Sequence, residues 1–151
     1  MASDYNSKHG IVSKSPFELY MAFVDMSNFV KMLPEDKRAS VQADYDTISV
    51  SVQGISIGAR VVRRQPYSRI EFEDNGAPFG FHVNLCFDAT TDPGKTEFYI
   101  EAMADLNFIM KTILGPKIRE ALDKIVDSMV DISEGRMPEG VDPDMLKNVN
   151  L

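Results

Sequence analysis

The segment FYIEAMADLNFIMKTILGPKIREALDKIV, residues 98–126, changes its hydrophobic period partway along. Before Asp105 apolar and polar residues alternate, which is the pattern of a strand with one buried face. After Asp105 apolar residues recur at the spacing of an amphipathic helix. The sequence therefore predicts a strand followed directly by a long helix over residues 107–133.

Gly115-Pro116 interrupts the predicted helix. Pro116 has no amide hydrogen for the carbonyl of Thr112, and its ring crowds that carbonyl, so we expect a bend at this point. The chain after Gly135 is punctuated by proline and glycine, and Asp142-Pro143 is expected to begin a last helical turn.

Upstream of the helix, residues 41–104 show the period of two in several short runs. Their short connections favour antiparallel neighbours, since parallel strands need long crossovers. We expect an antiparallel meander with one buried and one wet face, preceded by a strand over residues 6–13. Turn signals separate the runs at Gln53-Gly54, Pro66-Tyr67-Ser68, Asn75-Gly76-Ala77-Pro78 and Asp92-Pro93-Gly94.

A helix start is encoded between the first strand and the meander, at Ser15-Pro16-Phe17-Glu18. The Ser15 hydroxyl is placed to accept from the amide of Glu18, and the Glu18 carboxylate to accept from the amide of Ser15. Pro16 at the first helical position loses no hydrogen bond. A second short helix is expected to start at Asp25 or Ser27.

The predicted order is a strand, two short helices, a meander and a long C-terminal helix. This order resembles the helix-grip fold of the START-like, polyketide cyclase (SRPBCC) superfamily, over residues 5–133. The resemblance implies an α+β fold in which a curved antiparallel sheet of about seven strands wraps around the C-terminal helix. Three groups of residues carry it: Ser15–Tyr20 with Asp25–Phe29, Arg64–Pro66 with Ile70–Phe72, and Leu114–Pro116 with Leu122–Met129.

We expect residues 1–134 to form the helix-grip domain and residues 135–151 to form a C-terminal tail. In this superfamily a cavity lies between the sheet and the long helix. Alternation predicts its lining: Val50, Val61, Phe72, Phe81, Val83, Phe98 and Ile100 from the sheet, facing Met110, Leu114, Ile118 and Ala121 from the helix. Such a lining is typical of a ligand pocket, and the alternative is that the same residues pack as a solid core; the resemblance favours the cavity.

Polar candidates for this cavity are few. Arg63 continues the inward row of Ala59 and Val61, so we expect it at the cavity mouth, where it could hold a ligand carboxylate. Tyr20 and Asn28, on the two short helices, are weaker candidates.

No catalytic or metal-binding constellation is visible in the sequence. His82 lies on the outward row of its strand, and no second histidine or cysteine stands at the spacing of metal ligands. Cys86 lies on the same row and is expected to be an inert thiol, because no histidine–acid pair accompanies it. We therefore expect no metal and no cofactor.

The same outward row carries little charge for a face that meets water. His82, Asn84 and Cys86 lie beside Tyr99 and Met103 on neighbouring strands. Weakly polar exposed patches often mark contacts. A homodimer through this face, cover by the C-terminal tail, and chance composition are the three explanations that stay open.

The composition is that of an ordinary globular domain, with 44% hydrophobic and 26% charged residues in 151. No apolar run approaches the roughly 20 residues that span a bilayer. Residues 1–10 do not have the pattern of a signal peptide, and one cysteine forms no internal disulfide. We therefore expect a cytoplasmic location and no membrane span.

The net charge of −7 argues against a nucleic-acid partner, because such proteins carry a basic surface that neutralises phosphates. The same acidic balance argues against binding to anionic membranes.

Three functions remain open from the sequence. The first is binding of a small apolar molecule, lipid-like or polycyclic, in the cavity. The second is a cyclase/dehydratase-type enzyme that acts on an apolar substrate there. The third is a protein-interaction module without a small-molecule ligand. The nine methionines suit an adaptable apolar site and an ordinary core alike.

Overall fold

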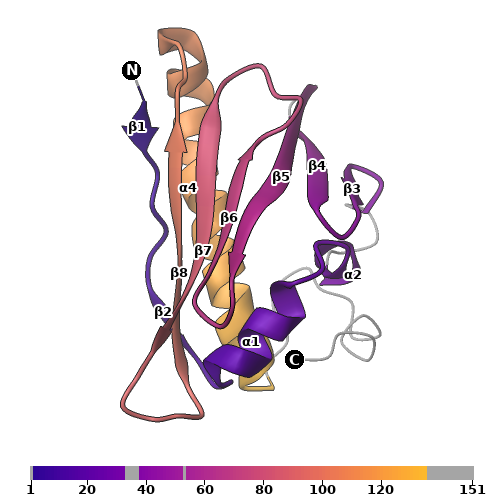
Figure 1. The fold of residues 1–151 in the computed structure, drawn as a ribbon. Helices are drawn as coiled ribbons and strands as arrows, with labels where there is room; N and C mark the ends of the chain where they lie inside the picture. Colours follow the sequence, from indigo (N-terminus) through magenta and orange to yellow (C-terminus); the bar gives the residue numbers. More distant parts are fainter. Residues whose placement is uncertain (1, 33–37, 53, 136–151) are drawn as a thin grey trace.

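The computed structural model of the chain describes residues 2–32, 38–52 and 54–135 (Figure 1). Its helices are α1 (Pro16–Phe23), α2 (Asn28–Met32) and α4 (Phe108–Ser133). Its strands are β1 (Ser3–Asp4), β2 (Gly10–Val12), β3 (Val41–Ala43), β4 (Thr47–Val52), β5 (Ile55–Gln65), β6 (Arg69–Asp74), β7 (Phe81–Ala89) and β8 (Thr96–Ala104).

The strands form one sheet in the order β1-β8-β7-β6-β5-β4-β3, with β2 also paired to β8. Every pairing is antiparallel, which confirms the predicted meander from β3 to β8. The sheet has eight strands where about seven were expected. Of the predicted first strand, residues 6–13, only β2 forms, and β1 is an additional strand that precedes the predicted range.

Between β1 and β2, side chains replace part of the regular backbone pairing with β8. The amides of Tyr5 and Ser7 donate to the carbonyls of Ala102 and Ile100 of β8, as in a regular ladder. The return bonds are made by side chains, since the Ile100 amide donates to Ser7 Oγ at 2.8 Å and the Ala102 amide to Asn6 Oδ1 at 3.2 Å. The segment thus follows β8 without regular strand geometry.

Helix α1 begins as the sequence predicts. The Glu18 amide donates to Ser15 Oγ at 3.2 Å, and the Ser15 amide donates to Glu18 Oε1 at 3.3 Å, which completes the capping box with Pro16 in the first turn. The start of α2 is prepared by Asp25, whose carboxylate accepts from the amide and the hydroxyl of Ser27.

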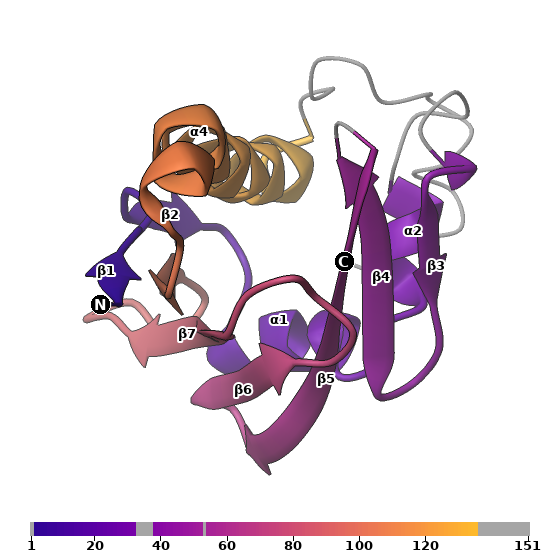
Figure 2. The ribbon, with the colours of Figure 1, turned by 90° about the horizontal axis from the view of Figure 1, so that it is seen from above.

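Helix α4 follows β8 directly and continues through Pro116, which is inside the helix. Asn107 caps its start by accepting from the Met110 amide at 2.8 Å. The helix lies against β2 and β8. Figure 2 shows the sheet as a curved wall, with β7 and β8 in the limb next to α4 and β4 and β5 in the limb across from it.

The interior contains two buried clusters. The first joins α1, the sheet and the end of α4, and its rings Phe23, Phe87 and Phe98 lie 5.5–6.0 Å apart. The second joins the start of α4 to β8 through Leu114, Ala102 and other residues. The α+β helix-grip architecture predicted from the sequence is therefore confirmed.

The predicted tail, residues 135–151, lies outside the described residues except for Gly135, and so does the helical turn expected at Asp142-Pro143. None of the described helices is long and apolar enough to cross a membrane.

Candidate functional site in the apolar interior

The cavity-lining residues predicted from the sequence divide into two groups. Five are buried in the two clusters: Phe72, Phe81, Phe98, Ile100 and Leu114. Five are only half-buried: Val50, Val61, Val83, Met110 and Ile118. The interior therefore contains both solid core and incompletely covered apolar surface.

The half-buried surface lies between the two clusters. Ala59, Val83 and Leu122 pack against both of them, while Val61 and Ile125 pack against the first and Ile118 against the second. We call these six residues the grip surface: Ala59, Val61, Val83, Ile118, Leu122 and Ile125. All six are aliphatic and half-buried, and α4, which carries three of them, lies against β2 and β8.

Ala121 was predicted to face the interior and is exposed. The covered face of α4 runs through Leu114, Ile118, Leu122, Val126 and Met129, in steps of four and three residues. Leu122, which sequence reasoning did not select, takes the inward position because α4 presents this face to the sheet.

Arg63 was predicted to lie at the cavity mouth, and the structure corrects this. The ladder between β5 and β6 pairs Val61 with Phe72 and then Arg63 with Glu71, which leaves Val62 unpaired in a bulge. The extra residue reverses the alternation. Arg63 therefore lies on the outer face, with a side chain 64% exposed, 3.7 Å from the carboxylate of Glu71.

Arg64 takes the inward position instead, and its guanidinium is hydrogen-bonded to neighbouring parts of the chain. It donates to the Val24 carbonyl at 2.9 and 3.1 Å, to the Tyr45 carbonyl at 2.8 Å and to Asp46 Oδ1 at 2.7 Å. It also lies over the Tyr45 ring at 4.2 Å. Arg64 thereby joins the end of α1 to the turn between β3 and β4, and it is not available to a ligand.

The Tyr5 hydroxyl is the buried polar side-chain atom, within the described residues, that has no hydrogen-bond partner. Tyr5 belongs to the second cluster, and its ring lies against Gly115 of α4. A methyl group at Gly115 would stand 3.3 Å from the ring, so the absence of a side chain there permits the close approach. Sequence reasoning did not select Tyr5, because only the fold shows that its hydroxyl is unpaired.

The two weaker polar candidates serve the fold. The Tyr20 ring is buried in the first cluster, 6.2 Å from that of Phe87. Asn28 Nδ2 donates to the Ala22 carbonyl at 2.8 Å and so ties α2 to α1.

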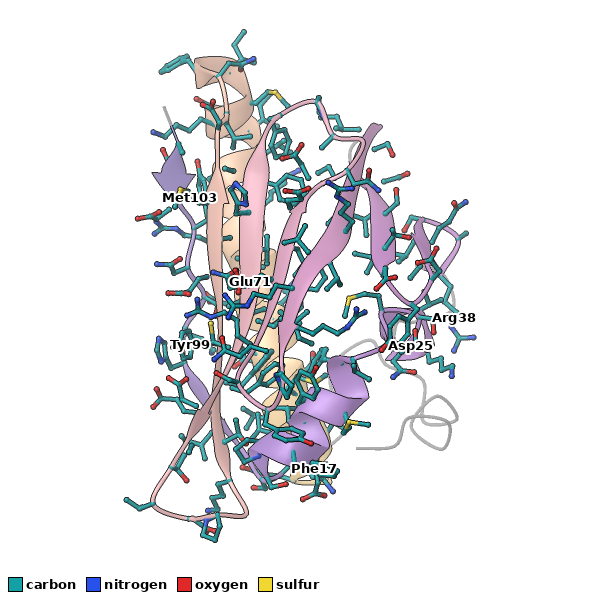
Figure 3. All side chains as sticks on the ribbon, in the orientation of Figure 1. Phe17, Asp25, Arg38, Glu71, Tyr99 and Met103 are labelled. Carbon is teal, nitrogen blue, oxygen red and sulfur yellow. The ribbon has the colours of Figure 1, made fainter. Side chains whose placement is uncertain are left out.

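The outer face of β7 and β8 carries the weakly polar row, and Figure 3 shows Tyr99 and Met103 there with α4 behind the sheet. His82 is exposed on this face, as predicted. Cys86 is buried, and burial, together with the neighbouring Glu101 carboxylate, raises the pKa of its thiol to about 12. The thiol is therefore protonated and unreactive at neutral pH.

Two open hollows are lined by described residues outside the grip surface. One, of about 310 Å³, covers β3 and β4 next to Gly58 and Asn75. The other, of about 210 Å³, lies on the outer face between Asp4 and Met103. Within the described part of the chain no group of acidic, histidine or cysteine side chains is arranged to hold a metal ion.

Comparison with solved structures agrees with this fold. Norcoclaurine synthase from Thalictrum flavum, in complex with dopamine and hydroxybenzaldehyde, is similar with a TM-score of 0.64 at 8% identity, over 91% of this chain and 89% of that one. The Aha1 dimer from Colwellia psychrerythraea is similar with a TM-score of 0.58 at 13% identity, over 85% and 96%. A protein from Rhizobium loti gives 0.62 at 13% identity, over 86% and 96%.

At these identities the likeness shows the fold alone. No protein-family model matches the chain, and no curated protein sequence matches it. The chain is a helix-grip α+β protein, as its sequence resemblance implied.

Proposed function

We propose that the chain binds a small apolar molecule, lipid-like or polycyclic, on the grip surface between β5, β7 and α4. The observation that carries the proposal is the half-buried state of six aliphatic side chains that face a concave interior. Apolar surface left partly open between two solid clusters favours a ligand that completes its burial.

The size of the effect suits a carrier or sensor. Burial of about 300 Å² of apolar ligand surface gains about 7 kcal/mol at 25 cal/mol per Å², before the cost of association. The expected affinity is therefore roughly micromolar or weaker. Tyr5, in the second cluster, has a buried hydroxyl without a hydrogen-bond partner among the described residues.

The norcoclaurine synthase structure supports a small-molecule ligand as such, since that protein of similar fold is in complex with dopamine and hydroxybenzaldehyde. For this chain we prefer ligand binding over cyclase or dehydratase catalysis. The grip surface consists of aliphatic side chains, and Arg64, the inward cation beside it, is held by the fold. Acid–base catalysis would need a titratable group within reach of the ligand.

Two matched substitutions, each of which replaces an alanine by phenylalanine, test the proposal. Ala59 is half-buried on the grip surface, whereas Ala102 is buried in the second cluster. We expect Ala59→Phe to fill the open space, with stability held within about 0.5 kcal/mol and Nile red affinity lowered about tenfold. Ala102→Phe should overpack the core and cost about 1–3 kcal/mol.

Thermal unfolding and Nile red fluorescence measure both effects. Equal destabilisation by the two substitutions, with no dye bound by the parent protein, would show a solid core and would leave a protein partner as the function.

A further inference from the structure

The first turns of α4 expose large apolar side chains to solvent. Phe108 is 83% exposed, Ile109 67% and Ile113 51%, and Thr112 and Pro116 beside them are exposed too. Figure 1 shows that the first turn of α4 forms one extremity of the molecule. Exposed apolar clusters of this kind mark contact sites in soluble proteins.

The charges of α4 are segregated along its length. Residues 108–119 contain Lys111, Lys117 and Arg119 and no acidic residue, whereas the acidic residues of the helix all follow from Glu120 onward. The helix dipole favours the opposite order, with acidic groups at the start and basic groups at the end. The first turn has no acidic residue and the last turn no basic one, so this order does not serve helix stability.

Two of these cations are available to a partner. Arg119 is engaged, since it donates to the Asp4 carbonyl at 3.1 Å and lies over the Tyr5 ring. Lys111 and Lys117 form no ion pair with any part of the chain that the structure describes, and both are exposed. The apolar side chains are thus flanked by unpaired positive charge.

This combination disfavours two kinds of occupant. A second copy that packed this same face against itself would bring lysines against lysines, a repulsion that the acidic half of α4 is too distant to relieve. A partner helix would need a groove, and this end of α4 projects outward (Figure 1). A fluid anionic surface receives projecting apolar groups without a preformed groove.

We propose that the start of α4, with Phe108, Ile109, Ile113, Lys111 and Lys117, docks on the surface of an anionic phospholipid membrane. The apolar side chains enter the interface between headgroups and acyl chains, and the lysines contact the lipid phosphates. Each lysine should strengthen binding about fivefold. The net charge of −7 describes the whole chain. It does not argue against binding through residues 108–119, which contain basic residues and no acidic one.

Vesicle co-sedimentation of the full chain tests the proposal. Vesicles of equal parts phosphatidylcholine and phosphatidylserine should bind the protein, and added salt or pure phosphatidylcholine should weaken binding. The double substitution Phe108→Ser with Ile113→Ser should lower affinity about tenfold or more, because the exposed rings and methyl groups no longer insert.

Matched controls lie at the other end of the molecule. Phe17, on α1 in Figure 3, is 54% exposed, so Phe17→Ser should leave vesicle binding unchanged. Lys111→Glu should weaken binding, and Lys95→Glu, in the turn before β8, should not. Circular dichroism confirms that each variant is folded.

The proposal is overturned if the parent protein stays in the supernatant with anionic vesicles, or if the double variant binds as well as the parent. A dimer that the double variant abolishes, without vesicle binding, would assign these residues to a second copy instead. Ala59→Phe should bind vesicles like the parent, so failure of docking and failure of ligand binding are separate results.

Discussion

Arg63 and Arg64 are neighbours in β5 and lie on opposite faces of the sheet. Strict alternation from Val61 places Arg63 inward, and the unpaired Val62 reverses that assignment. A bulge is a property of how two strands pair. The residues on either side of Val62 include no glycine that would indicate a bulge in the sequence. Which of the two arginines faces inward could therefore not be predicted from the sequence.

The paired substitutions Arg64→Ala and Arg63→Ala test this register. Arg64→Ala leaves the Val24 and Tyr45 carbonyls without their charged donor, so we expect a loss of about 2–3 kcal/mol in the free energy of unfolding. Arg63→Ala removes an exposed ion pair and should change stability by less than about 0.5 kcal/mol. Urea unfolding measures both, and the reverse order would contradict the bulge.

Tyr5 gives a second prediction at this scale. Its buried hydroxyl lacks a partner, so Tyr5→Phe should keep or raise the free energy of unfolding, by up to about 1 kcal/mol. In Tyr99, by contrast, the hydroxyl donates to Asp88 at 2.9 Å, and Tyr99→Phe should cost about 1 kcal/mol. Equal losses in the two variants would mean that the Tyr5 hydroxyl is hydrogen-bonded.

At the scale of single elements, local signals were sufficient for the helices and for the meander. The capping box at Ser15 and the apolar period after Asp105 predicted α1 and α4 within a residue or two, because both signals act between near neighbours. The first strand was predicted over residues 6–13, whereas only Gly10–Val12 of that range is a strand and a further strand, Ser3–Asp4, precedes it. The pairing of this segment depends on Asn6 and Ser7, whose side chains replace backbone acceptors across to β8.

The start of α1 carries a stability prediction of its own. Ser15→Ala removes the acceptor for the Glu18 amide and should lower the free energy of unfolding by about 1 kcal/mol. Ser56→Ala, on the exposed face of β5, is the control and should have little effect. An unchanged urea midpoint for Ser15→Ala would show that the cap contributes nothing.

At the scale of the whole molecule, the sequence predicted which rows point inward and not how completely each is covered. The extent to which each row is covered depends on the curvature of the sheet and on how α4 packs against β2 and β8. Both are set by contacts between distant segments. Phe98 and Leu114 are therefore core, while Val61 and Ile118 stay half-buried. The division between core and candidate site appears only in the folded molecule.

The central claim is that an apolar ligand occupies the grip surface, and methyl NMR of the complex with naphthalene tests it most directly. Nuclear Overhauser effects should join naphthalene protons to the methyl groups of Val61, Leu122 and Ile125, because those methyls line the open part of the interior. The exposed methyls of Ile109 and Ile113 should show none. Contacts confined to Ile109 and Ile113, or no contacts at saturating naphthalene, would contradict an apolar site between the sheet and α4.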